Sequence, residues 1–284
     1  MVFDSPHSGT LYPEDFGHTV PMEALRSAED MYVDELFAAA TDHGASLLRA
    51  LFPRSYIDVN RRPLDLDADL LSGPWPEPLA PGSKTRKGRG LIRSRAKGNP
   101  IYDRELDVAE VRARLDAYYT PYHRELDRML ASRYAASGAV WHVNCHSWTP
   151  PATGHNGGPI RPIDFCLGDL DGTTCNPDFT ATVAAFLEDQ GYVVRVNRPF
   201  KGMELIRRHG QPQDQRHSLQ VEISRDLYMD KHSYAKLEGF EPLRETLSGL
   251  AAAICAYAAD RIPAQAGRED RPTPSPYPTA PTTP

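Results

Sequence analysis

The stretch Trp141 to Ser147 reads WHVNCHS, and its alternation of polar and apolar side chains predicts a buried β-strand. Successive side chains of a strand point to opposite faces of the sheet. His142, Asn144 and His146 therefore share one face, and the apolar residues between them share the other. Three polar groups in a row on a buried face need partners, which a metal, a substrate or hydrogen bonds within the core would supply.

Cys145 lies on the apolar face of this predicted strand. Because adjacent strand residues point to opposite faces, a nucleophilic pair of Cys145 with His146 is not expected, and we interpret Cys145 as a small buried thiol. The four cysteines show no CxxC spacing, so reduced thiols are expected and a zinc ribbon is excluded. They are Cys145, Cys166, Cys175 and Cys255.

A second alternating stretch, Leu219 to Ser224, reads LQVEIS and predicts another strand. Gln220, Glu222 and Ser224 fall on one of its faces. A carboxylate in the middle of such a strand is costly to bury unless a cation, a metal or a proton accompanies it. Glu222 is therefore a candidate general base, and a structural ion pair with a nearby arginine is the alternative.

Short β-branched or aromatic runs alternate with longer helical patterns along the chain, which indicates an α/β architecture. We expect a mixed, largely parallel central sheet covered by helices on both faces. The predicted strands are Val2–Ser5, Ser46–Phe52, Tyr56–Val59, Ala139–Cys145, Tyr192–Val196 and Leu219–Ile223. The predicted helices are Asp30–His43, Asp107–Tyr134, bent or broken at Pro121, Pro177–Gln190, with Asn176 as its N-cap, and Pro242–Ala259.

Composition limits the classes of protein that the chain can represent. Its 284 residues include 32 Lys plus Arg and 38 Asp plus Glu, and the resulting net charge of −6 argues against nucleic-acid binding. The longest apolar run, Leu250–Ala259, is shorter than the roughly 18 residues of a membrane span, and the first residues do not read as a signal peptide. We expect a cytoplasmic protein without a membrane partner. Its domain is predicted over residues 1–260, followed by a disordered Pro- and Thr-rich tail over 261–284.

Several further polar segments lie near predicted strand ends, where open α/β sheets gather their ligand sites. His7 follows the first predicted strand and could be a metal ligand, a base or an exposed loop residue. Asn60, Arg61 and Arg62 follow Tyr56–Val59, and guanidinium groups there would suit an anionic substrate or surface ion pairs. A later basic stretch contains Lys201, Arg207 and Arg208 and strengthens the case for an anion site.

The acidic run Ser27-Ala28-Glu29-Asp30 has two interpretations. A serine followed three residues later by an acid at the start of a helix resembles a capping box. The same acid could complete a set of two histidines and one carboxylate, the ligands that zinc hydrolases commonly use. The sequence contains no HExxH motif, so spacing alone does not decide between them.

Taken in order, these motifs resemble the N-formylglutamate amidohydrolase family over nearly all of residues 1–260. The motifs are SPHSGTLYP, AED before a helix, RSYIDVNRRP, YYTPYHREL, VNCHSW, DFCLGDLDGTTCNP, NRPFKG and LQVEISRDLYM. The resemblance implies a zinc-dependent amide hydrolase whose fold is similar to that of zinc carboxypeptidases and aspartoacylases. The chain differs from the zinc carboxypeptidases because it lacks their His-x-x-Glu motif. Residues 74–90, rich in Pro, Gly and basic residues, match no diagnostic pattern.

The resemblance also implies roles for individual residues. His7 and His146 match the metal histidines, and Asp30 matches the carboxylate ligand, with Glu29 as the alternative. Glu222 matches the catalytic glutamate, and Asn60 and Arg61 match the polar pair near the substrate, while Lys201 and Arg207 fall in a later basic loop.

The hypothesis is that Zn²⁺ lowers the pKa of a bound water toward about 7 and that Glu222 takes the proton. Arg61 would stabilise the oxyanion that forms on the acyl group of a small anionic N-acyl amino acid. Arg62, Arg93, Lys201 and Arg207 are candidates for holding its carboxylates. Two alternatives are a metallo-deacylase or carboxypeptidase-like peptidase with a different acyl substrate, and a non-catalytic binding protein.

Overall fold

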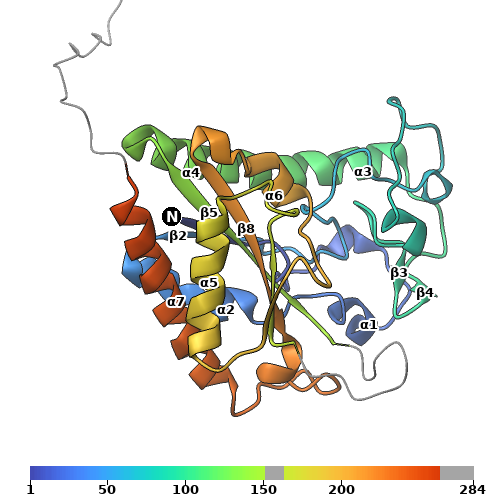
Figure 1. Ribbon diagram of the computed structural model, residues 1–284. Helices are drawn as coiled ribbons and strands as arrows, with labels where there is room; N and C mark the ends of the chain where they lie inside the picture. The colour runs from blue at the N-terminus through green and yellow to red at the C-terminus, as the bar shows by residue number, and fades with distance from the viewer. Residues whose placement is uncertain (151–162, 263–284) are drawn as a thin grey trace, which may run out of the picture.

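The computed structural model describes residues 1–150 and 163–262. Its centre is a six-stranded β-sheet with the order β2-β1-β5-β8-β6-β7 (Figure 1). Neighbouring strands run parallel except for the β8–β6 pair, which is antiparallel, so the predicted mixed, largely parallel sheet is confirmed. The strands are β1 (Val2–Ser5), β2 (Ser46–Arg49), β5 (Val140–Trp148), β6 (Phe165–Gly168), β7 (Val194–Val196) and β8 (Arg216–Ser224), and β3 (Arg95–Ala96) pairs separately with β4 (Asn99–Pro100).

Helices cover both faces of this sheet, as predicted (Figure 1). They are α1 (Met22–Arg26), α2 (Val33–Leu36), α3 (Val108–Arg114), α4 (Thr120–Ser137), α5 (Pro177–Asp189), α6 (Glu204–His209) and α7 (Phe240–Asp260). Apolar side chains of α2, α5 and α7 form one core cluster with the sheet, and those of α4 and α6 belong to a second. Within residues 1–150 and 163–262, no helix combines the length and the hydrophobicity that a membrane span requires.

The two longest strands, β5 and β8, pair in register over nine residues and present different chemistry on their two faces. One face is apolar and packs against α2, α5 and α7. The other face is polar although it is also buried. The apolar face carries Trp141, Val143, Cys145, Leu219, Val221 and Ile223, and the polar face carries His142, Asn144, His146, Ser218, Gln220, Glu222 and Ser224.

Hydrogen bonds connect the groups of the polar face, and they continue onto the neighbouring strand β1. Asp4 accepts hydrogen bonds from His142 Nε2 at 2.9 Å and from Asn144 Nδ2 at 2.7 Å. His142 Nδ1 lies 2.7 Å from Ser218 Oγ, and Tyr122 Oη of α4 donates to Asp4 at 2.7 Å. These bonds compensate the loss of water that burial imposes on each group.

One strand prediction is corrected, and one strand of the central sheet was not predicted. Tyr56–Val59 is not a strand; turns form there, because Tyr56 N–H donates to Pro53 O and the Asp58 carboxylate accepts the N–H of Asn60. β6 is absent from the predicted strands, because its four residues are too few to show an alternating pattern.

The predicted helices are also less regular than expected. Only Val33–Leu36 is α-helical within the predicted helix at Asp30–His43, and a 3₁₀-helix follows it to His43. The predicted helix around Pro121 is continuous, but a π-helical segment at Leu115–Tyr119 separates α3 from α4. The irregularity that a proline imposes on a helix is thus taken up by the turn before it.

The predicted start of α5 is confirmed, with Asn176 Oδ1 accepting the N–H of Asp178 at 3.0 Å. Cys145, Cys166 and Cys175 are buried free thiols. The predicted tail lies outside the described residues, apart from its first two.

Candidate active site

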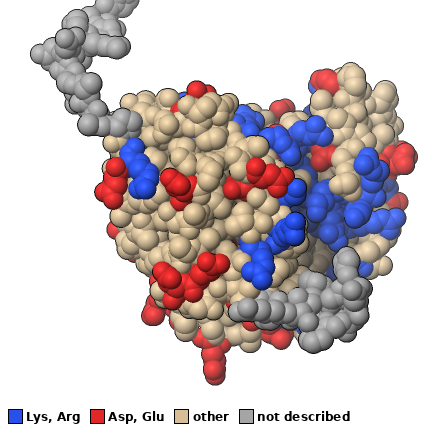
Figure 2. Space-filling model, in the orientation of Figure 1, with Lys and Arg blue, Asp and Glu red and all other residues tan. Residues whose placement is uncertain are grey.

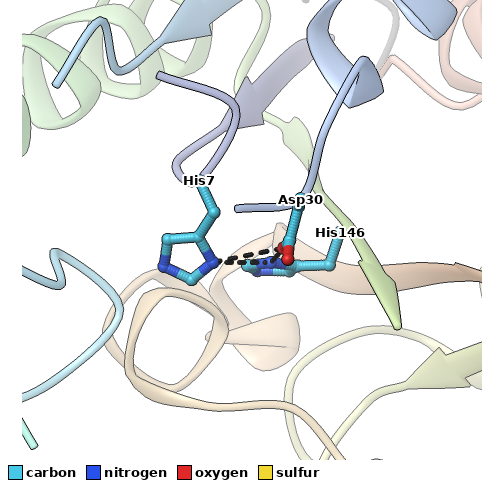
Figure 3. Close-up of side chains that lie close together, drawn as sticks. All are labelled: His7, Asp30 and His146. Atoms are coloured by element: carbon cyan, nitrogen blue, oxygen red, sulfur yellow. Dashed lines mark hydrogen bonds and ion pairs between the residues drawn. The ribbon is translucent and has the colours of Figure 1, made fainter. Parts of the chain in front are cut away.

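His7, Asp30 and His146 converge at the carboxyl ends of β1 and β5 (Figure 3). His7 follows β1 directly, and its backbone carbonyl accepts the N–H of Asp30 at 2.9 Å, which holds the two segments together. Asp30 Oδ2 lies 3.3 Å from His7 Nδ1 and 2.8 Å from His146 Nδ1, and the two Nδ1 atoms are 3.1 Å apart. All three side chains are buried.

The outer nitrogen of each imidazole faces a hydrogen-bond acceptor. His7 Nε2 donates to Asp58 Oδ1 at 2.7 Å, and His146 Nε2 lies 2.8 Å from Asn144 Oδ1. Asn144 Nδ2 donates to Asp4, so its oxygen is free to accept from His146 Nε2, while Asn60 Nδ2 lies 3.0 Å from the same nitrogen. In the neutral His7 ring, donation through Nε2 to Asp58 leaves Nδ1 free of a proton.

His7 Nδ1, His146 Nδ1 and Asp30 Oδ2 therefore face one another. Two imidazole nitrogens and one carboxylate oxygen are the donor set that a divalent metal ion such as Zn²⁺ prefers. A tetrahedral zinc ion with bonds of about 2.0–2.1 Å holds its ligand atoms about 3.3 Å from each other. The observed separations of 2.8, 3.1 and 3.3 Å lie close to that value, so the residues fit a metal ion.

Arginines neutralise the outer oxygen of Asp30. Its Oδ1 accepts hydrogen bonds from Arg54 at 3.2 Å and from Arg225 at 3.1 Å. Burial by itself would raise the pKa of Asp30, but the positive charge of Arg54 is the largest opposing influence, and the pKa lies well below its usual range. Asp30 is thus kept ionised, as a metal ligand must be.

Glu222 lies beside His146, because the two residues are register partners on β8 and β5. Its side chain is buried except for 9% of its surface, and Gln220 Nε2 donates to its Oε1 at 2.9 Å. Burial is the main cause that raises the pKa of Glu222 to about 7, and the charge of Asp30 acts in the same direction. Among the described residues Glu222 has no salt-bridge partner, so the structural ion pair is not observed. A carboxyl poised near neutral pH is suited to proton transfer.

These side chains open into a cavity of about 800 Å³ whose lining includes ten Lys and Arg residues. Figure 2 shows Lys and Arg side chains gathered around the hollow on this side of the molecule. The chain has a negative net charge, but this cavity is strongly positive, which suits an anionic ligand. The lining Lys and Arg residues are Arg54, Arg61, Lys84, Lys87, Arg89, Arg93, Arg95, Lys97, Lys201 and Arg225.

Some of the other predicted site residues line this cavity beside the His7–Asp30–His146 cluster, and others lie outside it. Asn60 Nδ2 is 3.0 Å from His146 Nε2, and Arg61 lines the cavity with its Nη2 3.7 Å from Asp58. Lys201 lines the rim and pairs with Asp171 at 2.7 Å. Arg62 and Arg207 do not reach this cavity; both are exposed and line a smaller adjoining one of about 360 Å³.

Glu29, the alternative carboxylate, is turned away from the histidines. It accepts a hydrogen bond from Tyr12 Oη at 2.5 Å and faces Arg26. The predicted capping box is not present, because Ser27 ends α1 and donates to Ala24 O, while Tyr32 precedes α2.

Asp58, Arg54 and Arg225 are site residues that the sequence analysis did not single out. Asp58 lies in the RSYIDVNRRP motif, but the strand predicted there does not indicate that its side chain faces His7. Arg54 is the first residue of the same motif, and Arg225 follows Ser224 within LQVEISRDLYM, so membership of a motif was the available signal.

A strand-end cluster of two histidines and an aspartate beside a buried glutamate is an arrangement found in metal-dependent hydrolases. The N-formylglutamate amidohydrolase family matches residues 1–229, and the chain belongs to this family.

Named relatives agree with this assignment. The chain is 48% identical to the N-formylglutamate amidohydrolase of Ralstonia eutropha JMP134, whose crystal structure superposes with a TM-score of 0.87 over 91% of this chain and 94% of that one. It is 30% identical to the N-formylglutamate deformylase of Pseudomonas aeruginosa, over 82% of this chain and 83% of the relative. The Agrobacterium tumefaciens gene product Atu2144 shares the fold, with a TM-score of 0.65 at 21% identity over 92% and 91% of the two chains.

Proposed function

We propose that this protein hydrolyses the amide bond of N-formylglutamate to formate and glutamate in a zinc-dependent reaction. The observation that carries the proposal is the His7–Asp30–His146 cluster, placed beside Glu222 in a cationic cavity. The names of the Ralstonia and Pseudomonas relatives support the substrate.

Three side chains would hold the metal: His7 and His146 through Nδ1, and Asp30 through Oδ2. A bound Zn²⁺ supplies Lewis-acid chemistry, lowering the pKa of water to about 7 and polarising a carbonyl group. Asp58 fixes the orientation and tautomer of the His7 imidazole, and Asn144 and Asn60 hold the His146 ring through its Nε2.

Glu222 is the general base and general acid of the reaction. Its carboxylate accepts a proton from water as the oxygen attacks the formyl carbon, and it returns that proton to the glutamate nitrogen as the carbon–nitrogen bond breaks. Arg61 stabilises the negative charge that develops on the formyl oxygen. Asn60 and Lys201, which line the cavity, contact the substrate, and Arg62 and Arg207 add positive charge at the adjoining cavity.

The test combines metal analysis with a substrate panel. We expect about one zinc per purified chain, lost in His146→Ala, because one of three protein ligands is removed. The control His43→Ala removes an exposed histidine that contacts Ser248 and should keep its zinc.

The panel compares N-formyl, N-acetyl and peptide substrates. Hydrolysis of N-formylglutamate above all others supports the proposal. Full zinc occupancy in His146→Ala would remove the ligand assignment, and a stronger preference for an acetyl or peptide substrate would replace the proposed function with another metallo-deacylase.

A further inference from the structure

Most of the arginines that reach deep into the cavity are occupied by the protein itself. Arg54 uses its guanidinium on Asp30 and Asp58. Arg225 donates to Ser147, to Asp30 and to two backbone carbonyls. Most of the N–H donors of these two groups are therefore used within the protein.

Arg61 is largely occupied as well. Its Nε donates to Arg89 O at 3.0 Å, its Nη1 donates to Asn60 O at 2.8 Å, and its Nη2 lies 3.7 Å from Asp58. Only part of its guanidinium remains for a substrate.

Arg93 differs from these three. It lines the same cavity and is partly buried, yet it makes no hydrogen bond or ion pair with any residue in 1–150 or 163–262. Its Nε is buried without a partner. An N–H withdrawn from water without an acceptor is unfavourable, so this edge of the guanidinium is poised for a ligand that supplies one.

The surroundings of Arg93 are themselves positive. Burial is the main cause that lowers the pKa of Arg93 to about 9, and the charges of Arg54, Arg61 and Arg89 act in the same direction. Lys84 and Lys87, which line the cavity on the same segment, have no acidic partner among the described residues. An anion bound here would relieve this repulsion.

Arg93 is linked to the metal cluster through one neighbouring segment. Leu91 O, two residues before it, accepts the N–H of Asp58 at 2.8 Å, and Asp58 in turn holds His7. Asn60, by contrast, touches His146 directly. Because Arg61 is assigned to the formyl oxygen, Arg93 remains in the same cavity for a carboxylate of the substrate.

We propose that Arg93 binds the side-chain carboxylate of an acidic N-acyl amino acid and so makes the site select acidic over neutral substrates. A planar guanidinium fork matches a carboxylate through two parallel hydrogen bonds. This inference rests on the proposed function for the identity of the substrate.

The experiment compares wild type, Arg93→Gln and Arg93→Lys as zinc-loaded protein. Steady-state kinetics with N-formylglutamate and with N-formylglutamine, whose side chain is neutral, give KM and kcat for each. Calorimetric titration with glutarate measures dicarboxylate binding without turnover. Arg86→Gln is the matched control, since Arg86 lies in the same basic segment but is exposed and donates to Pro81 O.

We expect Arg93→Gln to raise KM for N-formylglutamate and Kd for glutarate by about 30-fold or more, the usual scale for losing one partner of a buried charge pair. Its kinetics with N-formylglutamine should change only a few-fold. Arg93→Lys should fall between, because it keeps the charge and loses the fork. Arg86→Gln should match wild type.

Two results would overturn the inference: an unchanged KM for N-formylglutamate in both Arg93 variants, or an equal loss with N-formylglutamine. If wild type hydrolyses neither compound but binds glutarate through Arg93, the proposed function fails while the carboxylate site stands. Circular dichroism confirms that each variant is folded.

Discussion

The two faces of the β5–β8 strand pair come from alternate residues of the same two segments, yet they have different tasks. Leu219, Val221 and Ile223 on one face are fully buried against α5 and α7. Gln220 and Glu222 on the other face lie between them in sequence and reach the candidate site. Both faces share the backbone of β5 and β8, so a substitution on one face tests either core packing or site chemistry while the strands stay the same.

This difference shows how a single alternating pattern can specify both a core and an active site. The apolar face contributes free energy of folding through burial, which has no directional requirement. The polar face must satisfy every buried donor and acceptor and still leave a few groups free for chemistry. We therefore expect apolar-face variants to lose stability and polar-face variants to lose function.

The largest effect is expected on the polar face, from Glu222→Gln. An amide of nearly the same shape cannot accept the proton of water, so kcat should fall by about 10²- to 10⁴-fold. Zinc content and the urea midpoint should stay at the wild-type value. Glu125→Gln, on an exposed acid that pairs with Arg128, is the control for kcat. Activity of Glu222→Gln within a few-fold of wild type would assign the base to another group.

Leu219→Ala tests the apolar face directly across the backbone. Leu219 is 0% exposed, and removing a buried leucine side chain typically costs about 2–5 kcal/mol of unfolding free energy. Urea denaturation measures this loss, while kcat/KM of the folded variant should remain near wild type. Leu237→Ala makes the same change on a residue that is 42% exposed and should cost less than about 0.5 kcal/mol. A large fall in kcat/KM without loss of stability would contradict the expected separation of stability and function between the two faces.

A smaller effect is expected from Asp58→Asn, which acts on the polar face from a neighbouring loop. The neutral amide holds His7 Nε2 less strongly, so zinc affinity should fall by about 10- to 100-fold. Competition with a chelator of known affinity measures the change. Asp127→Asn, on a surface acid that pairs with Arg208, should leave the affinity unchanged. An unaltered affinity in Asp58→Asn would show that Asp58 serves Arg54 and Arg61 rather than His7.

The sequence predicts the strand-borne half of the site and misses much of the rest. Alternation alone places His146 and Glu222 on one buried face, and the register of β5 with β8 then brings them together. Asp58 and Arg54 lie in a segment of turns, where no periodic pattern indicates the direction of a side chain. Their partners His7 and Asp30 come from distant parts of the chain, and only the tertiary fold reveals them.

The π-helical segment between α3 and α4 affects how a change in the number of residues there would act on the helices. Such a segment contains one residue more than the α-helical path it replaces. Deleting one residue between Leu115 and Tyr118 would therefore restore a regular α-helix that joins the same two ends. Arg114, which donates to Tyr56 O, and Tyr119, which donates to Arg61 O, would keep their directions. The chain should therefore tolerate the loss of one residue here better than a deletion within α4, which would rotate the flanking turns by about 100° relative to each other.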